Sequence, residues 1–189
     1  MSNKESYITN FIFSLSHNSL VLDAGCEYGK NMVLRNDVSI VGIDSNPNCV
    51  KICQDRDLCV VVGNIDKINF PDKTFDAAIC VNTINKLYNP IDRLHAIKEL
   101  FRVVEDNGYI FIKCLSIHSF YNIKNQMRYI RLLNTENDFI ISKNFQNEWK
   151  VYHLFDKYEF INLLRTVDCE ILDILFEDDY IIGVVKKLK

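Results

Sequence analysis

This sequence of 189 residues has little proline, glycine or tryptophan, with 3, 6 and 1 copies respectively. It also lacks repeats, low-complexity tracts and any apolar run long enough to span a membrane. Its N-terminus shows no signal-peptide pattern of an apolar core followed by small residues. Hydrophobic residues nevertheless make up 48% of the chain, which is enough for a substantial core. We therefore expect a single globular domain over residues 1–189 that does not associate with membranes.

Cysteine is not scarce, because the chain has seven, but no two of them have the C-x-x-C spacing of many zinc and redox sites. Most fall in expected strands or on an apolar helix face, where a reduced thiol behaves as a small hydrophobic group. Cys49, Cys53 and Cys59 have no fourth ligand nearby, so we expect no metal site. A reducing compartment, the cytoplasm or also the nucleus, is the expected location.

Net positive charge is also lacking, since the formal net charge is −3, so the chain is not a globally basic nucleic-acid binder. The charge is uneven, however. Residues 113–157 hold seven lysines and arginines against four acids, a net charge of +3, which leaves −6 for the remainder. This segment is either an ordinary solvated surface or one that binds phosphates.

Expected strands and helices alternate along the chain, which predicts an α/β fold with a mostly parallel sheet. The last two strands are joined by the short segment 177–179 and should form an antiparallel hairpin. Residues 107–108 (Asn-Gly) should end the helix before them, and 134–147 should be an irregular loop. The expected helices are 5–15, a short one after Gly29, 47–56, 90–105, 117–133 and 156–167; the expected strands are 19–24, 38–43, 58–62, 74–81, 109–115, 169–176 and 180–187.

A glycine loop joins the first strand to the segment after it. Asp23 ends the apolar run and is followed by Gly25 and Gly29, while Asp44 ends the next apolar strand. Such a turn offers unpaired backbone N–H groups to a negatively charged ligand, and Asp44 is placed to accept hydrogen bonds from ribose hydroxyls. A nicotinamide dinucleotide usually requires the three glycines of G-x-G-x-x-G, and this chain has only two.

The loop resembles motif I, D-x-G-x-G-x-G, of class I S-adenosylmethionine (AdoMet) methyltransferases. The C-terminal hairpin fits the same Rossmann-like fold, which has a seven-stranded sheet of order 3-2-1-4-5-7-6. The resemblance implies that AdoMet is the cofactor and that Asp23 reaches its ammonium group directly or through water. Glu27 stands where the motif usually has glycine, so its carboxylate either weakens binding or points outward.

Further motifs of this class follow the third and fourth strands. The resemblance implies that the carbonyl of Asn64 and the N–H of Ile65 contact the adenine, and that Val81 and Asn82 border the methyl group. Asn64 departs from the more usual aspartate but keeps an acceptor. The full expected set of cofactor-binding residues is Asp23, Gly25, Cys26, Glu27, Gly29, Lys30, Asp44, Ser45, Asn64, Ile65, Val81 and Asn82.

One segment in the last third of the chain is more specific. Residues 150–160 (KVYHLFDKYEF) resemble the R-Y-Y-H-x-F-x-x-G-E-L segment of the eukaryotic tRNA wobble-uridine carboxymethyl methyltransferases. This resemblance implies methyl-esterification of 5-carboxymethyluridine in the tRNA anticodon loop. The chain departs from that family at Asn85-Lys86, where the family has paired histidines, and at Leu115-Ser116, where it has W-A. Only about twenty residues precede the first strand, so the family's N-terminal arm is not represented.

The implied reaction needs no general base, because a carboxylate is already ionised at neutral pH. It needs placement and charge balance from cationic or hydrogen-bonding groups. We expect His153 to be the main such group, although a structural histidine would show the same pattern. The alternative for Lys86 and Lys113 is that they are ordinary surface charges. The candidates are Lys86, Lys113, His118, Tyr152 and His153.

The expected strand 58–62 is uniformly apolar and should lie at the sheet edge, which invites pairing with another chain. The resembled family uses a small zinc-binding activator subunit there, which implies a heterodimer; cover by the chain's own N-terminal residues is the alternative. Three functions stay open: the tRNA methyltransferase, a methyltransferase acting on a small molecule or protein, and a catalytically silent subunit with the same fold.

Overall fold

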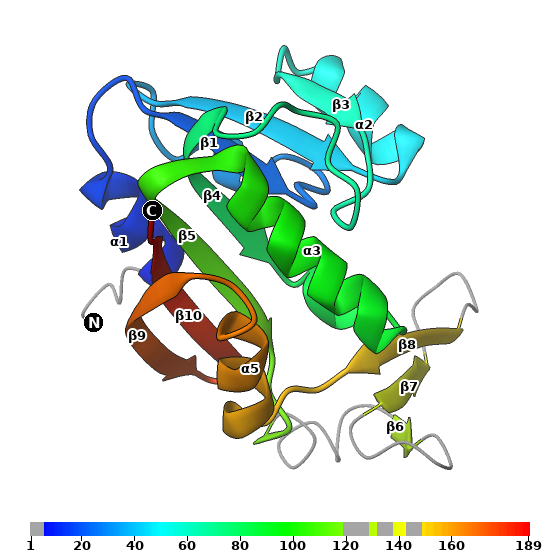
Figure 1. The fold of residues 1–189 in the computed structure, drawn as a ribbon. Coiled ribbons are helices and arrows are strands. Elements are labelled where there is room, and N and C mark those ends of the chain that lie inside the picture. Colours follow the sequence, from blue (N-terminus) through cyan, green and yellow to red (C-terminus); the bar gives the residue numbers. More distant parts are fainter. Residues whose placement is uncertain (1–5, 119–128, 132–137, 143–148) are drawn as a thin grey trace, which may run out of the picture.

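A seven-stranded sheet of order β3-β2-β1-β4-β5-β10-β9 forms the centre of the computed structural model (Figure 1). The structure describes residues 6–118, 129–131, 138–142 and 149–189. Strands β1 to β5 are mutually parallel, and β10 is antiparallel to both β5 and β9. This confirms the expected fold class and strand order. The strands of the sheet are β1 Leu20–Ala24, β2 Ser39–Asp44, β3 Val60–Val62, β4 Phe75–Val81, β5 Val104–Leu115, β9 Cys169–Glu177 and β10 Tyr180–Lys187.

Three of the four α-helices in the described part of the chain begin with the same capping device. The side chains of Asn46, Asn89 and Asp156 each accept a hydrogen bond from a backbone N–H in the first turn of the helix that follows. This pairs an N–H group that the helix itself leaves without a partner. After Asn46 and Asn89, a proline fixes the backbone angle of the first helical residue. The helices are α1 Tyr7–Ser14, α2 Pro47–Gln54, α3 Pro90–Val103 and α5 Lys157–Leu164, with 3₁₀ turns η1 Asn31–Val33 and η2 Ile84–Lys86.

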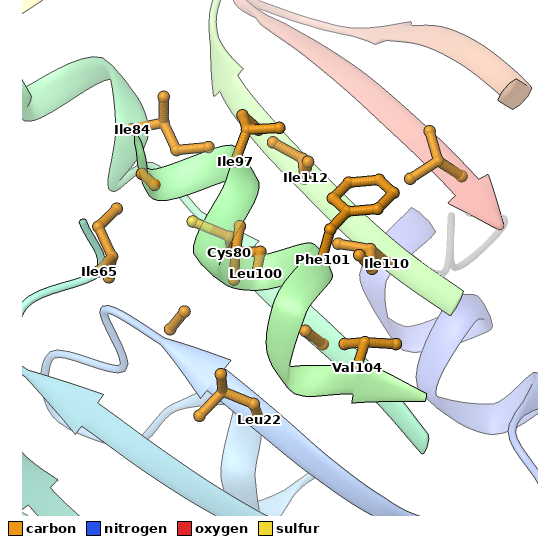
Figure 2. Close-up of a cluster of buried hydrophobic side chains, with 14 of the residues drawn as sticks. Leu22, Ile65, Cys80, Ile84, Ile97, Leu100, Phe101, Val104, Ile110 and Ile112 are labelled. Atoms are coloured by element: carbon orange, nitrogen blue, oxygen red, sulfur yellow. The ribbon is translucent and has the colours of Figure 1, made fainter. Parts of the chain in front are cut away.

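Two hydrophobic clusters cover the two faces of the sheet. One lies under α3 and α5 and contains Ile110, Ile112 and Cys114 of β5; the other includes side chains of α1 and α2 and contains Phe111. Figure 1 shows α3 and α5 in front of the sheet and α1 behind it, and Figure 2 shows α3 packed on β4 and β5. Because side chains alternate along a strand, Lys113 lies on the same face as Phe111, toward α1 and α2.

A second, three-stranded antiparallel sheet was not expected from the sequence. It consists of β6 Tyr129–Arg131, β7 Asp138–Ser142 and β8 Trp149–His153. The expected helix 117–133 is therefore wrong at 129–131, and the expected loop 134–147 is wrong at 138–142. The other residues of those two ranges, apart from 117–118, lie outside the described part of the chain.

Two boundaries in the main domain also differ. The helix expected after Gly29 is only the turn η1. Strand β5 begins at Val104, immediately after α3, so Asn107 and Gly108 do not end the helix but lie in an irregularity of the strand. There the partner in β5 moves from Val104, opposite Phe75, to Tyr109, opposite Ala77. Among the described helices, none combines the length and apolarity needed to cross a membrane.

Gly183 allows α5 to approach β10 closely, which predicts a specific stability effect. A Cβ at this position would lie 2.9 Å from Phe160 Cε1 and 3.0 Å from Leu164 Cδ1, both on buried side chains. We expect Gly183→Ala to lower the free energy of unfolding by about 1–3 kcal/mol because the packed ring must shift. Gly63→Ala is the matched control, since its nearest contact would be Ile43 Cβ at 3.7 Å. Urea unfolding followed by circular dichroism measures both, and equal effects would contradict this account.

Candidate active site

Asp23 lies in the middle of the sheet, between Gly42 of β2 and Ile79 of β4, and its side chain has no exposed surface. Its Oδ2 accepts a hydrogen bond from Asn31 Nδ2 at 3.4 Å. Its Oδ1 is buried and has no hydrogen-bond partner among the described residues. Burial raises the pKa of Asp23 to about 7, partly opposed by the hydrogen bond from Asn31. A carboxylate in this position is suited to a cationic group.

The loop after β1 has the backbone geometry that its glycines predict. Gly25 and Gly29 have φ values of +83° and +71°, which side chains rarely adopt. The N–H groups of Gly25 and Cys26 donate to the carbonyl of Ile43, at 2.8 and 3.0 Å. A Cβ at position 25 would lie 2.2 Å from Thr83 Oγ1, so the loop is in contact with the segment after β4.

Glu27 also lies in the left-handed region, with φ of +49°. This explains why glycine is usual at its position, because another residue type costs about 1–2 kcal/mol there. The Glu27 side chain is exposed, which agrees with the outward-pointing alternative. The neighbouring Cys26 is buried instead, and a Cβ at Gly42 would lie 2.7 Å from its Sγ. The side chain of Cys26 therefore packs between the loop and β2, and only the backbone of Cys26 is left to contact a ligand.

Asp44, at the carboxyl end of β2, connects the loop to the next strand. Its Oδ2 accepts a hydrogen bond from Glu27 N and its Oδ1 accepts one from Asn46 N, both at 2.9 Å. These bonds fix the orientation of the carboxylate and leave each oxygen with further acceptor capacity for a ribose hydroxyl. Ser45 and Lys30 are exposed beside it.

The segment after β3 lies along the same edge of the sheet, because β3 is parallel to β2 and next to it. Asn64 is exposed and its backbone pairs with Lys67 in an isolated bridge. Ile65 is buried in the core under α3 (Figure 2). The side chain of Ile65 therefore anchors the turn while that of Asn64 stays available to a ligand.

Asn82 follows β4 and has φ of +56°. Its N–H donates to the carbonyl of Lys113 at 2.7 Å, and its Oδ1 is buried without a partner in the described residues. Burial is the main cause that raises the pKa of nearby Tyr180, and the side chain of Asn82 partly opposes that rise. Val81, partly buried, pairs with Lys113 in the adjacent strand.

Lys113 is an expected substrate-binding residue whose backbone is joined to Asn82. Its Nζ forms an ion pair with Glu177 Oε2 and lies 4.3 Å from the centroid of the Tyr180 ring. Asp23 follows Val21, a member of the cluster on the α1 and α2 face, by two residues, so Asp23 and Lys113 lie on the same face. Sequence reasoning missed Glu177 and Tyr180, although the antiparallel hairpin would have placed its turn beside the end of β5.

His153 lies in a different environment. Its side chain is 5% exposed, its Nε2 is 2.6 Å from Glu159 Oε1, and its ring packs edge-on against Phe155. Phe155 belongs to the cluster on the α3 and α5 face, opposite to the face of Asp23 and Lys113. This geometry supports the structural alternative for His153, which joins β8 to α5.

The other expected substrate-binding residues are not brought to Lys113 as a group. Tyr152 is partly buried next to His153 in β8, and Lys86 is exposed in η2. The ring of His118 lies 5.8 Å from that of Phe176, edge to face. Asn85, beside Lys86, is 1% exposed and neither atom of its amide has a partner among the described residues. No group of three or more metal-ligating side chains occurs in the segments that the structure describes.

Comparisons with known proteins agree with this geometry. Residues 22–112 match the family model described as "Methyltransferase domain". The chain is 31% identical over 124 residues to the tRNA (carboxymethyluridine(34)-5-O)-methyltransferase alkbh8 of Xenopus tropicalis. That match covers 66% of this chain and 20% of the relative, so the chain spans about a fifth of the relative's length.

Solved structures agree on the fold. A SAM-dependent methyltransferase from Methanosarcina mazei superposes with a TM-score of 0.76 at 20% identity, covering 95% of this chain and 97% of that one. A chain from the complex between the Haloferax volcanii Trm112 methyltransferase activator and a methyltransferase gives a TM-score of 0.66 at 13% identity, with coverage of 93% and 85%.

The strand order, the glycine loop and the family match define the class. Residues 22–112 match a methyltransferase domain and the sheet has the class I methyltransferase fold, so the cofactor that the family match and the fold support is AdoMet. Within this class its sequence resembles the tRNA carboxymethyluridine methyltransferases, at 31% identity to the Xenopus tropicalis relative.

The residues of the site fit AdoMet. The unpartnered Oδ1 of Asp23 is an acceptor for the cofactor's ammonium, and the oriented carboxylate of Asp44 suits its ribose. Asn64 is available for the adenine. When bound, AdoMet supplies an electrophilic methyl group on a positively charged sulfur.

The buried carboxylate of Asp23 predicts pH-dependent cofactor binding. Its pKa in the free protein is about 7, and pairing with an ammonium should lower that pKa, so binding releases a proton below pH 7. We expect AdoMet affinity to rise about tenfold between pH 5.5 and 7. Asp23→Asn should bind more weakly at pH 7 and show no such rise. Titration calorimetry at several pH values measures both.

The raised pKa of Asp23 also predicts how the stability of the free protein changes with pH. Because burial raises the pKa above the unfolded value of 3.8, free wild-type protein should lose stability as pH rises from about 4 through 7, and Asp23→Asn should not. Asp55→Asn, which removes an exposed carboxylate at the end of α2, is the control and should retain the wild-type pH dependence. Identical pH profiles for wild type and Asp23→Asn would rule out this role.

Proposed function

We propose that this methyltransferase acts on tRNA, esterifying the carboxylate of 5-carboxymethyluridine at the wobble position to 5-methoxycarbonylmethyluridine. The observation that carries the proposal is the 31% identity over 124 residues to a tRNA (carboxymethyluridine(34)-5-O)-methyltransferase. The segment 150–160, with Tyr152 and His153, supports it further.

The proposed reaction requires no proton transfer by the side chains of this protein. The acceptor carboxylate is ionised at neutral pH, so no residue has to remove a proton from it. The residues must hold the carboxylate beside the cofactor and balance its charge, and the ammonium of Lys113 lies on the same face of the sheet as Asp23. The net charge of +3 in residues 113–157 suits a phosphate backbone nearby.

The direct test is nucleoside mass spectrometry. Purified protein, incubated with AdoMet and with tRNA that carries 5-carboxymethyluridine, should convert that nucleoside to its methyl ester. Asp44→Asn, which weakens the ribose contact, should reduce conversion at limiting AdoMet by tenfold or more. Unchanged 5-methoxycarbonylmethyluridine in cells that lack the gene would exclude the tRNA reaction. Absence of AdoMet binding under any condition would leave only the silent-subunit alternative.

The proposed assembly is a heterodimer with a small zinc-binding activator subunit at the edge strand β3. Val61 and Val62 are 44% and 59% exposed on this edge. The alternative cover is the chain's own N-terminal residues, but of these the described helix α1 packs on the sheet elsewhere, with Phe11 against Phe111 of β5. The neighbour solved in complex with the Trm112 methyltransferase activator shares the fold and supports a partner of this kind.

Substituting the edge tests the assembly. Val62→Lys should reduce the amount of co-expressed activator that co-purifies by tenfold or more, because a charge would replace an apolar contact. Ile91→Lys replaces an aliphatic side chain of similar exposure, 58%, at the start of α3, and should co-purify as wild type does. Wild-type recovery of the activator with Val62→Lys would exclude this edge, and a lone chain that is monomeric and binds AdoMet would exclude an obligatory partner.

A further inference from the structure

Lys113, Glu177 and Tyr180 form a small charged group at the carboxyl end of β5. In the sheet, Lys113 lies between Val81 of β4 and Ile182 of β10. Its side chain is 14% exposed, that of Glu177 is 22% exposed, and the two form an ion pair. The Tyr180 ring contacts the same ammonium, with its centroid 4.3 Å from Nζ. An ammonium with this little access to water requires a counter-ion.

The turn that carries Glu177 is anchored to the end of β5. The N–H of Ser116 donates to the carbonyl of Asp179 at 2.9 Å, and Tyr180 pairs with Leu115. The Glu177 side chain is therefore held near Lys113 by a fixed backbone, while its carboxylate lies close enough to the surface to exchange its contact with Lys113 for water. Tyr180 can retain the ammonium through a cation–π contact when Glu177 leaves.

This group lies on the cofactor side of the sheet. Asp23 is opposite Ile79, which is opposite Phe111, and Lys113 follows two residues later. Strand spacing and rise place the Cα atoms of Asp23 and Lys113 roughly 12 Å apart along the edge of one face. The backbone of Asn82 joins the two regions through its hydrogen bond to the carbonyl of Lys113.

The charge state of this group limits which acceptors can use Lys113. A substrate carboxylate can take the place of Glu177 with little change in Coulomb energy, and the released Glu177 becomes hydrated. A neutral acceptor cannot replace Glu177, because it would leave the ammonium without a counter-ion. The product ester is neutral, so Glu177 can return when the ester has formed.

We propose that Glu177 is a resident counter-ion that occupies Lys113 in the free protein and is displaced by the carboxylate of the substrate, which makes Glu177 a specificity-determining residue. This inference rests on the proposed function, because it takes the acceptor to be a carboxylate. It assigns Lys113 to binding of the substrate carboxylate and Tyr180 to positioning of the ammonium.

The test compares an acid with its ester. Binding of the nucleosides 5-carboxymethyluridine and 5-methoxycarbonylmethyluridine is measured by calorimetry in the presence of S-adenosylhomocysteine. Glu177→Gln should bind the acid three- to tenfold more tightly than wild type does, because the competing carboxylate is gone, and should bind the ester equally well. Lys113→Met should lose the preference for the acid. Asp178→Asn, an exposed acid in the same turn, is the matched control for a general change of charge.

The outcomes separate the two proposals. Unchanged affinity of Glu177→Gln for the acid, or an equal gain for the acid and the ester, overturns the counter-ion role. An equal gain in Asp178→Asn also overturns it, because that result reflects overall charge. Thermal unfolding verifies that Glu177→Gln is folded. Failure of the proposed function is detected in a different experiment, in which wild-type protein would form no ester on tRNA that carries 5-carboxymethyluridine.

Discussion

The enclosed carboxylate of Asp23 is the constraint on which the rest of the site depends. It lies between two parallel strands, its Oδ1 is unpartnered within the described residues, and burial raises its pKa to about 7. Leaving such a group without a hydrogen-bond partner costs about 1–3 kcal/mol. A cationic ligand removes that cost, so the interior of the free protein is complementary to a charge that the cofactor carries.

The sequence predicted the main sheet well because its parallel strands are buried on both faces and read as apolar runs. Helix starts were equally clear, since Asn46 and Asn89 each precede a proline. The sheet β6-β7-β8 was missed because its strands are three to five residues long, and such short strands are defined by their pairing partners more than by their own pattern. The sequence pattern at Asn107 predicted a helix end, because an Asn-Gly pair is typical both of helix ends and of irregularities within strands.

The candidate site likewise contains some residues that local sequence motifs predicted and others that they did not. The residues predicted to bind the cofactor lie at or just after the carboxyl ends of β1 to β4. Because the carboxyl ends of parallel strands meet at one edge, local motifs predicted that Asp23, Asp44 and Asn82 share that edge. Lys113 was identified as a candidate, but its partner Glu177 is 64 residues away in sequence, and only the hairpin brings them together. His153 illustrates the reverse case, because a family motif suggested chemistry while Glu159, six residues later, provides a structural partner.

The contact between Gly25 and Thr83 links two parts of the candidate site. A single added carbon at Gly25 would overlap Thr83, so the loop after β1 and the segment after β4 are packed directly against each other. The first segment is the one expected to border the amino-acid end of AdoMet, and the second adjoins Asn82, whose N–H donates to the carbonyl of Lys113. A ligand that shifts either segment must therefore work against this packing, so the two parts of the cleft share one wall.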